Sequence, residues 1–152
     1  MDTRMIDWLL PLDMVSLNTR SHWSKDYARN RSNRRLIEYK WNIEQPNILP
    51  PCVVRLERYY STSKRQKRLD DDNYIGSLAI KGIRDSIAAI LVPKLAPGRA
   101  DHAKYGIEFH YAQIPTKGEG AIRIIIATED EYQELIERES LTGLGCLEKG
   151  KQ

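Results

Sequence analysis

KRQKRLDDDNYIGSLAIKGIRD, residues 64–85, is the stretch around which we expect the rest of the chain to be organised. It opens with four cations: Lys64, Arg65, Lys67 and Arg68. Three adjacent carboxylates follow: Asp70, Asp71 and Asp72. An apolar run then begins after Asn73 and carries Lys81 and Asp85. Side chains that can bind phosphates therefore lie directly beside oxygen ligands that can hold a divalent metal.

This stretch joins a predicted strand to a predicted helix. Residues 52–60 (CVVRLERYY) alternate apolar and polar side chains, which predicts a half-buried strand with Arg55 and Glu57 on its solvent face. Residues 61–68 form a polar basic loop. Residues 74–91 carry apolar side chains at the i, i+3, i+4 spacing of one amphipathic helix. The carboxylates are thus expected where loop gives way to helix.

Two elements are predicted before this stretch. Residues 5–10 (MIDWLL) suit a short strand that Pro11 ends. A helix is expected from near Ser24, a suitable N-cap, to just before Pro46. Its second half carries a core-facing apolar stripe, whereas its polar, cationic first half can equally be a flexible arm.

Three elements are predicted after it. Residues 105–114 and 121–128 alternate apolar and polar side chains, and the turn-rich connection between them predicts a β-hairpin. Thr128, followed three residues later by glutamate, resembles the capping box of a last helix over residues 129–138. The order β-α-β-α-β-β-α predicts an α+β fold, a mixed sheet with helices packed on it. We expect one domain over residues 1–152, frayed after about residue 143.

Composition restricts the class of protein. Hydrophobic residues make up 41% and charged residues 30% of the chain, which is typical of a soluble globular protein. The net charge is only +3, but eight of the 24 Lys and Arg residues fall within residues 29–35 and 64–68. Two cysteines far apart exclude a disulfide framework and a cysteine zinc site. No signal peptide or transmembrane stretch is evident, so we expect a cytoplasmic protein without a membrane partner.

The spacing of the aspartates suggests metal chemistry. If the backbone is extended there, Asp70 and Asp72 point to one side, about 6 to 7 Å apart along the strand, and Asp71 points to the other. Oxygen donors alone favour Mg²⁺ or Mn²⁺ over zinc. The alternative is an acidic run that only caps the helix, with Asp72 or Asn73 as the N-cap.

Two further residues, Lys81 and Asp101, have two interpretations each. Lys81 and Asp85 share one helix face at i, i+4, which favours a surface ion pair. Lys81 can instead neutralise a phosphate near the metal. Asp101 follows a Pro/Gly-rich loop and is either a turn aspartate or a third carboxylate that completes a metal site.

The ordered set of these motifs resembles the RusA family of Holliday junction resolvases. The similarity covers most of the chain in five segments: LPLDMVSLN (residues 10–18), RLERYYSTSKRQKRLDDDN (55–73), KGIRDSI (81–87), GRADH (98–102) and YGIEFHYAQIP (105–115). The resemblance implies a Mg²⁺-dependent endonuclease that resolves four-way DNA junctions as a homodimer, with Mn²⁺ able to substitute. Its paired metal-binding aspartates fall on Asp70 and Asp72, its third acidic ligand on Asp101 and its catalytic lysine on Lys81.

The expected DNA contacts are mainly cations that grip phosphates without reading sequence. They are Lys64, Arg65, Lys67, Arg68, Arg31, Arg34 and Arg35, together with Asn18 from the Ser-x-Asn segment of the resemblance. Two departures from the family pattern are a longer interval before Lys81 and a third acidic site that has Ala100 in place of its first aspartate. They leave two alternatives: a catalytically silent protein that binds branched DNA, and a structural protein with no DNA affinity.

Overall fold

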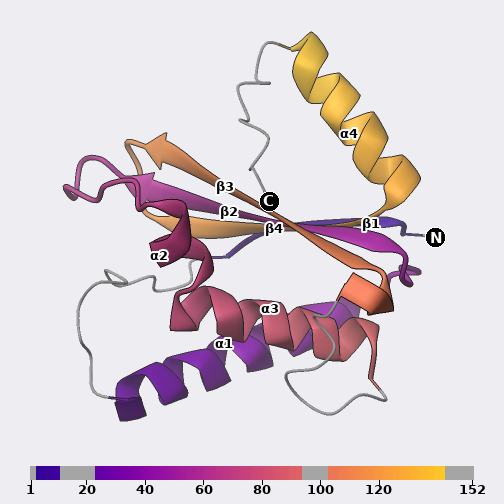
Figure 1. The fold of residues 1–152 in the computed structure, drawn as a ribbon, viewed down its shortest axis with the longest axis horizontal. Coiled ribbons are helices and arrows are strands. Elements are labelled where there is room, and N and C mark those ends of the chain that lie inside the picture. Colours follow the sequence, from indigo (N-terminus) through magenta and orange to yellow (C-terminus); the bar gives the residue numbers. More distant parts are fainter. Residues whose placement is uncertain (1–2, 11–22, 94–102, 143–152) are drawn as a thin grey trace.

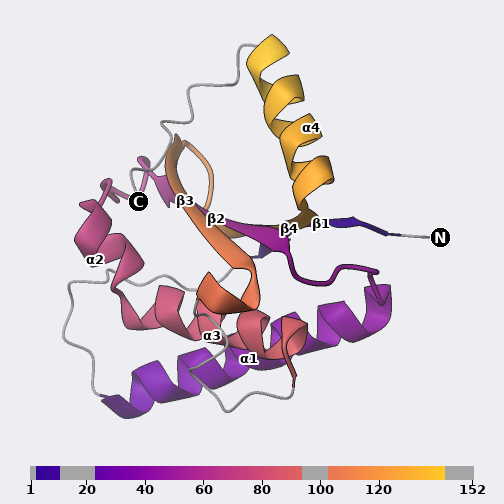
Figure 2. The same cartoon turned by 45° about the vertical axis from the view of Figure 1, so that its right-hand side comes forward.

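The computed structural model describes residues 3–10, 23–93 and 103–142. These ranges form one four-stranded mixed sheet with helices on both faces (Figure 1 and Figure 2). The strands are β1 (Met5–Leu10), β2 (Cys52–Ser61), β3 (Ile107–Thr116) and β4 (Ala121–Thr128). The helices are α1 (Trp23–Glu44), α2 (Asp71–Ile75), α3 (Leu78–Leu91) and α4 (Glu129–Leu141), with a 3₁₀ turn η1 (Ala103–Tyr105) before β3. The predicted α+β class is confirmed.

The two N-terminal elements form as predicted. β1 alternates between a buried face with Ile6, Trp8 and Leu10 and a more exposed face. α1 is helical through its cationic half, so the interpretation of that half as a flexible arm is wrong. Within the three described ranges, no helix is long and apolar enough to cross a membrane.

The predicted hairpin is wrong, although both of its strands form. The sheet order is β1-β4-β2-β3, so β2 lies between β3 and β4. β2 pairs with β3 in parallel and with β4 antiparallel. Residues 117–120 therefore cross the end of β2, where a Cβ on Gly120 would lie 3.3 Å from the Tyr59 carbonyl oxygen. Two consecutive strands show the same alternation and the same turn residues whether they pair directly or have a third strand between them. The sequence pattern therefore does not distinguish a hairpin from the observed arrangement.

The main core lies between the sheet and the layer of α1 and α3, which cover the same face (Figure 1). α3 contributes Ile80, Ile83 and Ile87, each 0% exposed, and α1 contributes Ile37. The sheet meets them with alternate residues of three strands: Ile6, Trp8, Leu10, Val54, Leu56, Ile122, Ile124 and Ile126. Burial of these apolar side chains is the dominant stabilising term of the fold.

The single helix predicted for residues 74–91 is two helices. α2 ends at Gly76, and Ser77 is the N-cap of α3, with its Oγ accepting the Ile80 N–H at 3.3 Å. The Ser77 hydroxyl also donates to the Tyr74 carbonyl at 2.9 Å. A serine whose side chain satisfies a free amide starts a new helix here, so the acidic residues lie on a separate short helix.

The strand predicted for residues 52–60 is confirmed as β2, but the expectation that its Arg55 and Glu57 face is exposed to solvent is wrong, because the face of the sheet beneath α4 buries charged side chains. Arg55 is 3% and Glu57 1% exposed. Arg55 pairs with Glu57 at 2.8 Å and with Glu139 of α4 at 2.7 Å. Glu57 is also 3.3 Å from Arg123. Alternate polar residues can be buried when their charges neutralise one another, as they do here.

Candidate functional site

The acidic residues lie at the N-terminus of α2. Asp70 is its N-cap: the backbone there is extended (φ −64°, ψ 157°), and Oδ1 accepts the Asn73 N–H at 2.9 Å. Asp71 and Asp72 form the first helical turn, and all three aspartate side chains are exposed. The prediction that a residue of this acidic run caps the helix is therefore confirmed, but the N-cap is Asp70 rather than Asp72 or Asn73.

The backbone is extended only at Asp70, so strand alternation does not apply to Asp71 and Asp72. Asp71 and Asp72 have helical backbone, so their side chains are separated by about 100° around the helix axis rather than lying on opposite faces. The extended backbone that would turn Asp71 to the side opposite Asp70 and Asp72 is therefore absent. Any of the three exposed carboxylates can face a ligand that approaches the start of α2.

α2 is held to the sheet by one buried tyrosine. Tyr74 is 1% exposed, and its hydroxyl donates to the Leu56 carbonyl of β2 at 2.9 Å. Its ring meets Tyr111 of β3 edge to face, with centroids 6.1 Å apart. Burial raises the pKa of the Tyr74 phenol well above its ordinary value, so it stays a neutral donor. This anchor places α2 beside the end of the sheet where β2 and β3 finish (Figure 1).

A second anchor holds the backbone just before Asp70. The Gln113 side chain of β3 accepts the Leu69 N–H at 3.0 Å and donates to the Leu69 carbonyl at 2.7 Å. Arg58 of β2 donates to the Lys67 carbonyl and to Gln113 Oε1, both at 3.0 Å. Neither side chain is evident from the sequence, because a polar residue on an alternating strand is expected to face solvent.

The four cations that precede the aspartates are exposed in the segment that follows β2. This segment turns back at once, with the Gln66 N–H bonded to the Ser61 carbonyl at 2.9 Å. Lys64 forms an ion pair with Glu119 from the connection between β3 and β4, not with the aspartates. Residues 62–68 therefore form a hydrogen-bonded turn, the cationic turn, which exposes its cationic side chains shortly before α2.

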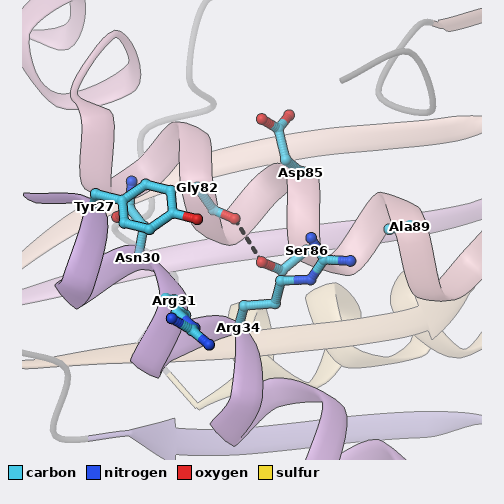
Figure 3. Close-up of a pocket in the computed structure, with 8 residues that line it drawn as sticks. All are labelled: Tyr27, Asn30, Arg31, Arg34, Gly82, Asp85, Ser86 and Ala89. Carbon is cyan, nitrogen blue, oxygen red and sulfur yellow. Dashed lines mark hydrogen bonds between the residues drawn. The ribbon is translucent and has the colours of Figure 1, made fainter. Parts of the chain in front are cut away.

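The other predicted DNA-binding cations lie on α1. Arg31, Arg34 and Arg35 are exposed, and Arg34 pairs with Glu38 one turn later at 2.8 Å. A groove between α1 and α3 is lined by Tyr27, Asn30, Arg31, Arg34, Gly82, Asp85, Ser86 and Ala89 (Figure 3). The Asp85 carboxylate points away from the two arginines in this view. Two of the α1 cations, Arg31 and Arg34, thus line the groove between α1 and α3.

Lys81 lies in the first turn of α3, which follows α2 directly. Its backbone N–H bonds to the Ser77 carbonyl at 2.9 Å, and its side chain is exposed. The predicted ion pair with Asp85 is not found between these two residues in the structure. Lys81 therefore presents its ammonium group to solvent near the end of the sheet that carries α2.

The described residues do not supply a third ligand from another element. Within residues 3–10, 23–93 and 103–142, no three His, Cys, Asp or Glu side chains gather to hold a metal ion. The third predicted ligand, Asp101, lies outside these residues, as does the predicted DNA contact Asn18. β3 runs parallel to β2, so η1 leads into the end of the sheet opposite α2. Asp70 at the N-cap of α2, with Asp71 and Asp72 in its first turn, is thus the acidic site that the structure describes.

No family model, curated protein or solved structure matches this chain. The similarity to RusA therefore rests on the order and spacing of the quoted motifs. The geometry adds an exposed acidic helix start, directly preceded by an exposed cationic turn and held by two anchors to the sheet.

Proposed function

We propose that the protein is a metal-dependent endonuclease that cuts branched DNA, with the four-way junction as its substrate. The observation that carries the proposal is the exposed acidic start of α2, which directly follows the exposed cationic turn. Asp70 alone fills the N-cap of α2, and Asp71 and Asp72 in its first turn also interact favourably with the helix dipole. Asp71 and Asp72 are left exposed beside phosphate-binding cations.

The donor set fits a hard divalent cation. Mg²⁺ in phosphate-processing sites is commonly held by one or two carboxylates, with water and substrate phosphates completing its shell. Asp70 and Asp72 provide such a pair. The third ligand that the resemblance implies, Asp101, precedes η1 in the sequence, and η1 leads into the opposite end of the sheet, so water and phosphate oxygens would fill the remaining positions. When bound, the cation would supply activation of a water molecule and neutralisation of charge on the scissile phosphate. Mn²⁺ has the same preference for oxygen donors and is expected to substitute.

The cationic side chains then bind the DNA backbone. Lys64, Arg65, Lys67 and Arg68 lie next to the aspartates in sequence, so they would grip phosphates that flank the cleaved bond. Lys81 at the start of α3 would donate to a phosphate oxygen and offset its charge. Binding of this kind weakens steeply as the salt concentration rises.

A homodimer would match the substrate. A four-way junction has approximate two-fold symmetry, so a two-fold dimer places one acidic site on each of two opposed strands. The predicted products are therefore paired, symmetric nicks.

Cleavage of a synthetic junction tests the proposal. We expect nicks with Mg²⁺ or Mn²⁺, none with a chelator, and much slower cleavage of linear duplex of the same sequence. Asp72→Asn is expected to abolish cleavage while leaving junction binding intact. Asp130→Asn, at an exposed position in the first turn of α4, is the matched control. Full cleavage by both the Asp70→Asn and the Asp72→Asn proteins would remove these residues from the site.

The second candidate is a branched-DNA-binding protein without catalysis. It is favoured by the absence of a three-ligand cluster within the described ranges. It predicts salt-sensitive binding of the junction in a band-shift assay but no nicks with either metal. Equal affinity for junction and linear duplex would contradict both candidates.

A further inference from the structure

Arg58 is a buried cation beneath the segment that leads to the aspartates. It is 5% exposed, and its guanidinium lies 5.5 Å from the centre of the Tyr60 ring. Burial lowers the pKa of this guanidinium. Within the described residues it forms no ion pair, and its hydrogen bonds go to the Lys67 carbonyl and to Gln113. A buried charge without a carboxylate is unfavourable for stability, so its contacts point to another role.

Gln113 can occupy only one orientation. Its Oε1 accepts from Arg58 and from the Leu69 N–H, both at 3.0 Å. Its Nε2 donates to the Leu69 carbonyl at 2.7 Å. If the amide were reversed, its NH₂ group would face two donors, so Arg58 fixes which way it points. Both backbone groups of Leu69 are thereby held to β3.

We propose that Arg58 and Gln113 are a positioning pair that fixes the backbone at Leu69 and so sets the direction of the Asp70 and Asp72 carboxylates. Leu69 immediately precedes Asp70, so a change in its backbone moves the cap residue and the start of α2 with it. The inference rests on the proposed function for its effect on metal binding. Side chains that orient metal ligands without touching the metal commonly change metal affinity about 10- to 100-fold when replaced.

The test uses Gln113→Leu, which keeps the side chain's size and removes all of its hydrogen bonds. Gln133→Leu, an exposed position on α4, is the matched control. Gln113→Glu keeps both acceptor bonds of Oε1 but replaces the donor with a carboxylate oxygen that faces the Leu69 carbonyl oxygen. Amide hydrogen exchange at residues 69–73 reports the backbone, Mn²⁺ titration reports the ligands, and thermal unfolding reports global stability.

We expect amides at residues 69–73 of Gln113→Leu to exchange at least about tenfold faster than in the control, and Mn²⁺ to bind about tenfold more weakly. Gln113→Glu should fall between Gln113→Leu and the wild type in both measurements. α3 amides should be unchanged, which separates local release from general loss of stability. Exchange equal to that of the control, or faster exchange with unaltered Mn²⁺ affinity, would overturn the inference.

Failure of the proposed function gives a different result. A wild-type protein that neither binds Mn²⁺ nor cuts a junction would overturn the proposed function. The exchange rates would then still decide whether the pair holds the backbone before Asp70.

Discussion

Replacing Glu139 by glutamine would leave the buried Arg55 guanidinium with one carboxylate instead of two. Arg55 donates to both oxygens of Glu139, at 3.1 and 2.7 Å, and lies 5.6 Å from the centre of the Tyr132 ring. Burial alone would lower the pKa of Arg55, but the hydrogen bond to Glu139 and the charge of Glu57 raise it above its ordinary value. The cluster therefore holds α4 on the sheet by a charge that must stay paired.

The size of the effect follows from these contacts. Removing one partner of a buried ion pair costs about 3–5 kcal/mol. Here Arg55 keeps Glu57 at 2.8 Å, and the Glu139 side chain is 16% exposed, so the loss should be smaller. We expect the unfolding free energy to fall by about 2 kcal/mol. For a chain of this length, that loss lowers the melting temperature by about 4–8 °C.

Urea and thermal unfolding followed by circular dichroism measure this loss. Glu137→Gln, at an exposed position on α4, makes the same change of charge and should stay within about 0.5 kcal/mol of the wild type. A double-mutant cycle with Arg55→Met should give a coupling energy of at least about 1 kcal/mol. Equal stability of the Glu139→Gln and Glu137→Gln proteins would refute the claim that the pair holds α4.

Three further predictions concern the fold. Ser77→Ala removes the N-cap of α3 and should cost about 1 kcal/mol of unfolding free energy, measured by urea unfolding against Ser32→Ala as an exposed control. The hydrogen bonds from Arg123 lower the pKa of Asp7, so this carboxylate stabilises the fold above its unfolded pKa and loses that contribution as the pH falls through its lowered folded pKa. Unfolding free energies measured between about pH 5 and pH 2 should therefore fall more steeply for the wild type than for Asp7→Asn; parallel profiles would contradict this. Burial raises the pKa of Cys52 to about 11, so a thiol reagent at about pH 8 should label it only after unfolding, in a protein whose other cysteine is replaced by serine.

Local patterns predicted the elements but not their neighbours in the sheet. Apolar periodicity and helix caps are local, and they gave β1, α1 and α4 close to their observed bounds. Strand pairing is not local: β2 lies between two strands that are consecutive in the chain, and only long-range contacts decide that order. Burial of Arg55 and Glu57 depends on α4 and its Glu139, which lies far along the chain.

The sequence predicted which residue types make up the site, but not how they are arranged in space. Adjacent cations and carboxylates are visible in the sequence, and they are exposed and adjacent in the structure. The position of the cap was missed because Asp70, Asp72 and Asn73 are all good N-cap residues. Gln113 was missed because its partner, Leu69, is brought to it only by the packing of the segment after β2.

A crystal structure of the protein soaked in Mn²⁺, with anomalous scattering to locate the metal, tests the central claim most directly. We predict that Mn²⁺ is bound by carboxylate oxygens of Asp70 and Asp72 at the start of α2, in a protein that also cuts a four-way junction. The same map shows whether Asp101 joins them. Anomalous density that is absent from the start of α2, at a Mn²⁺ concentration that supports cleavage, would contradict it.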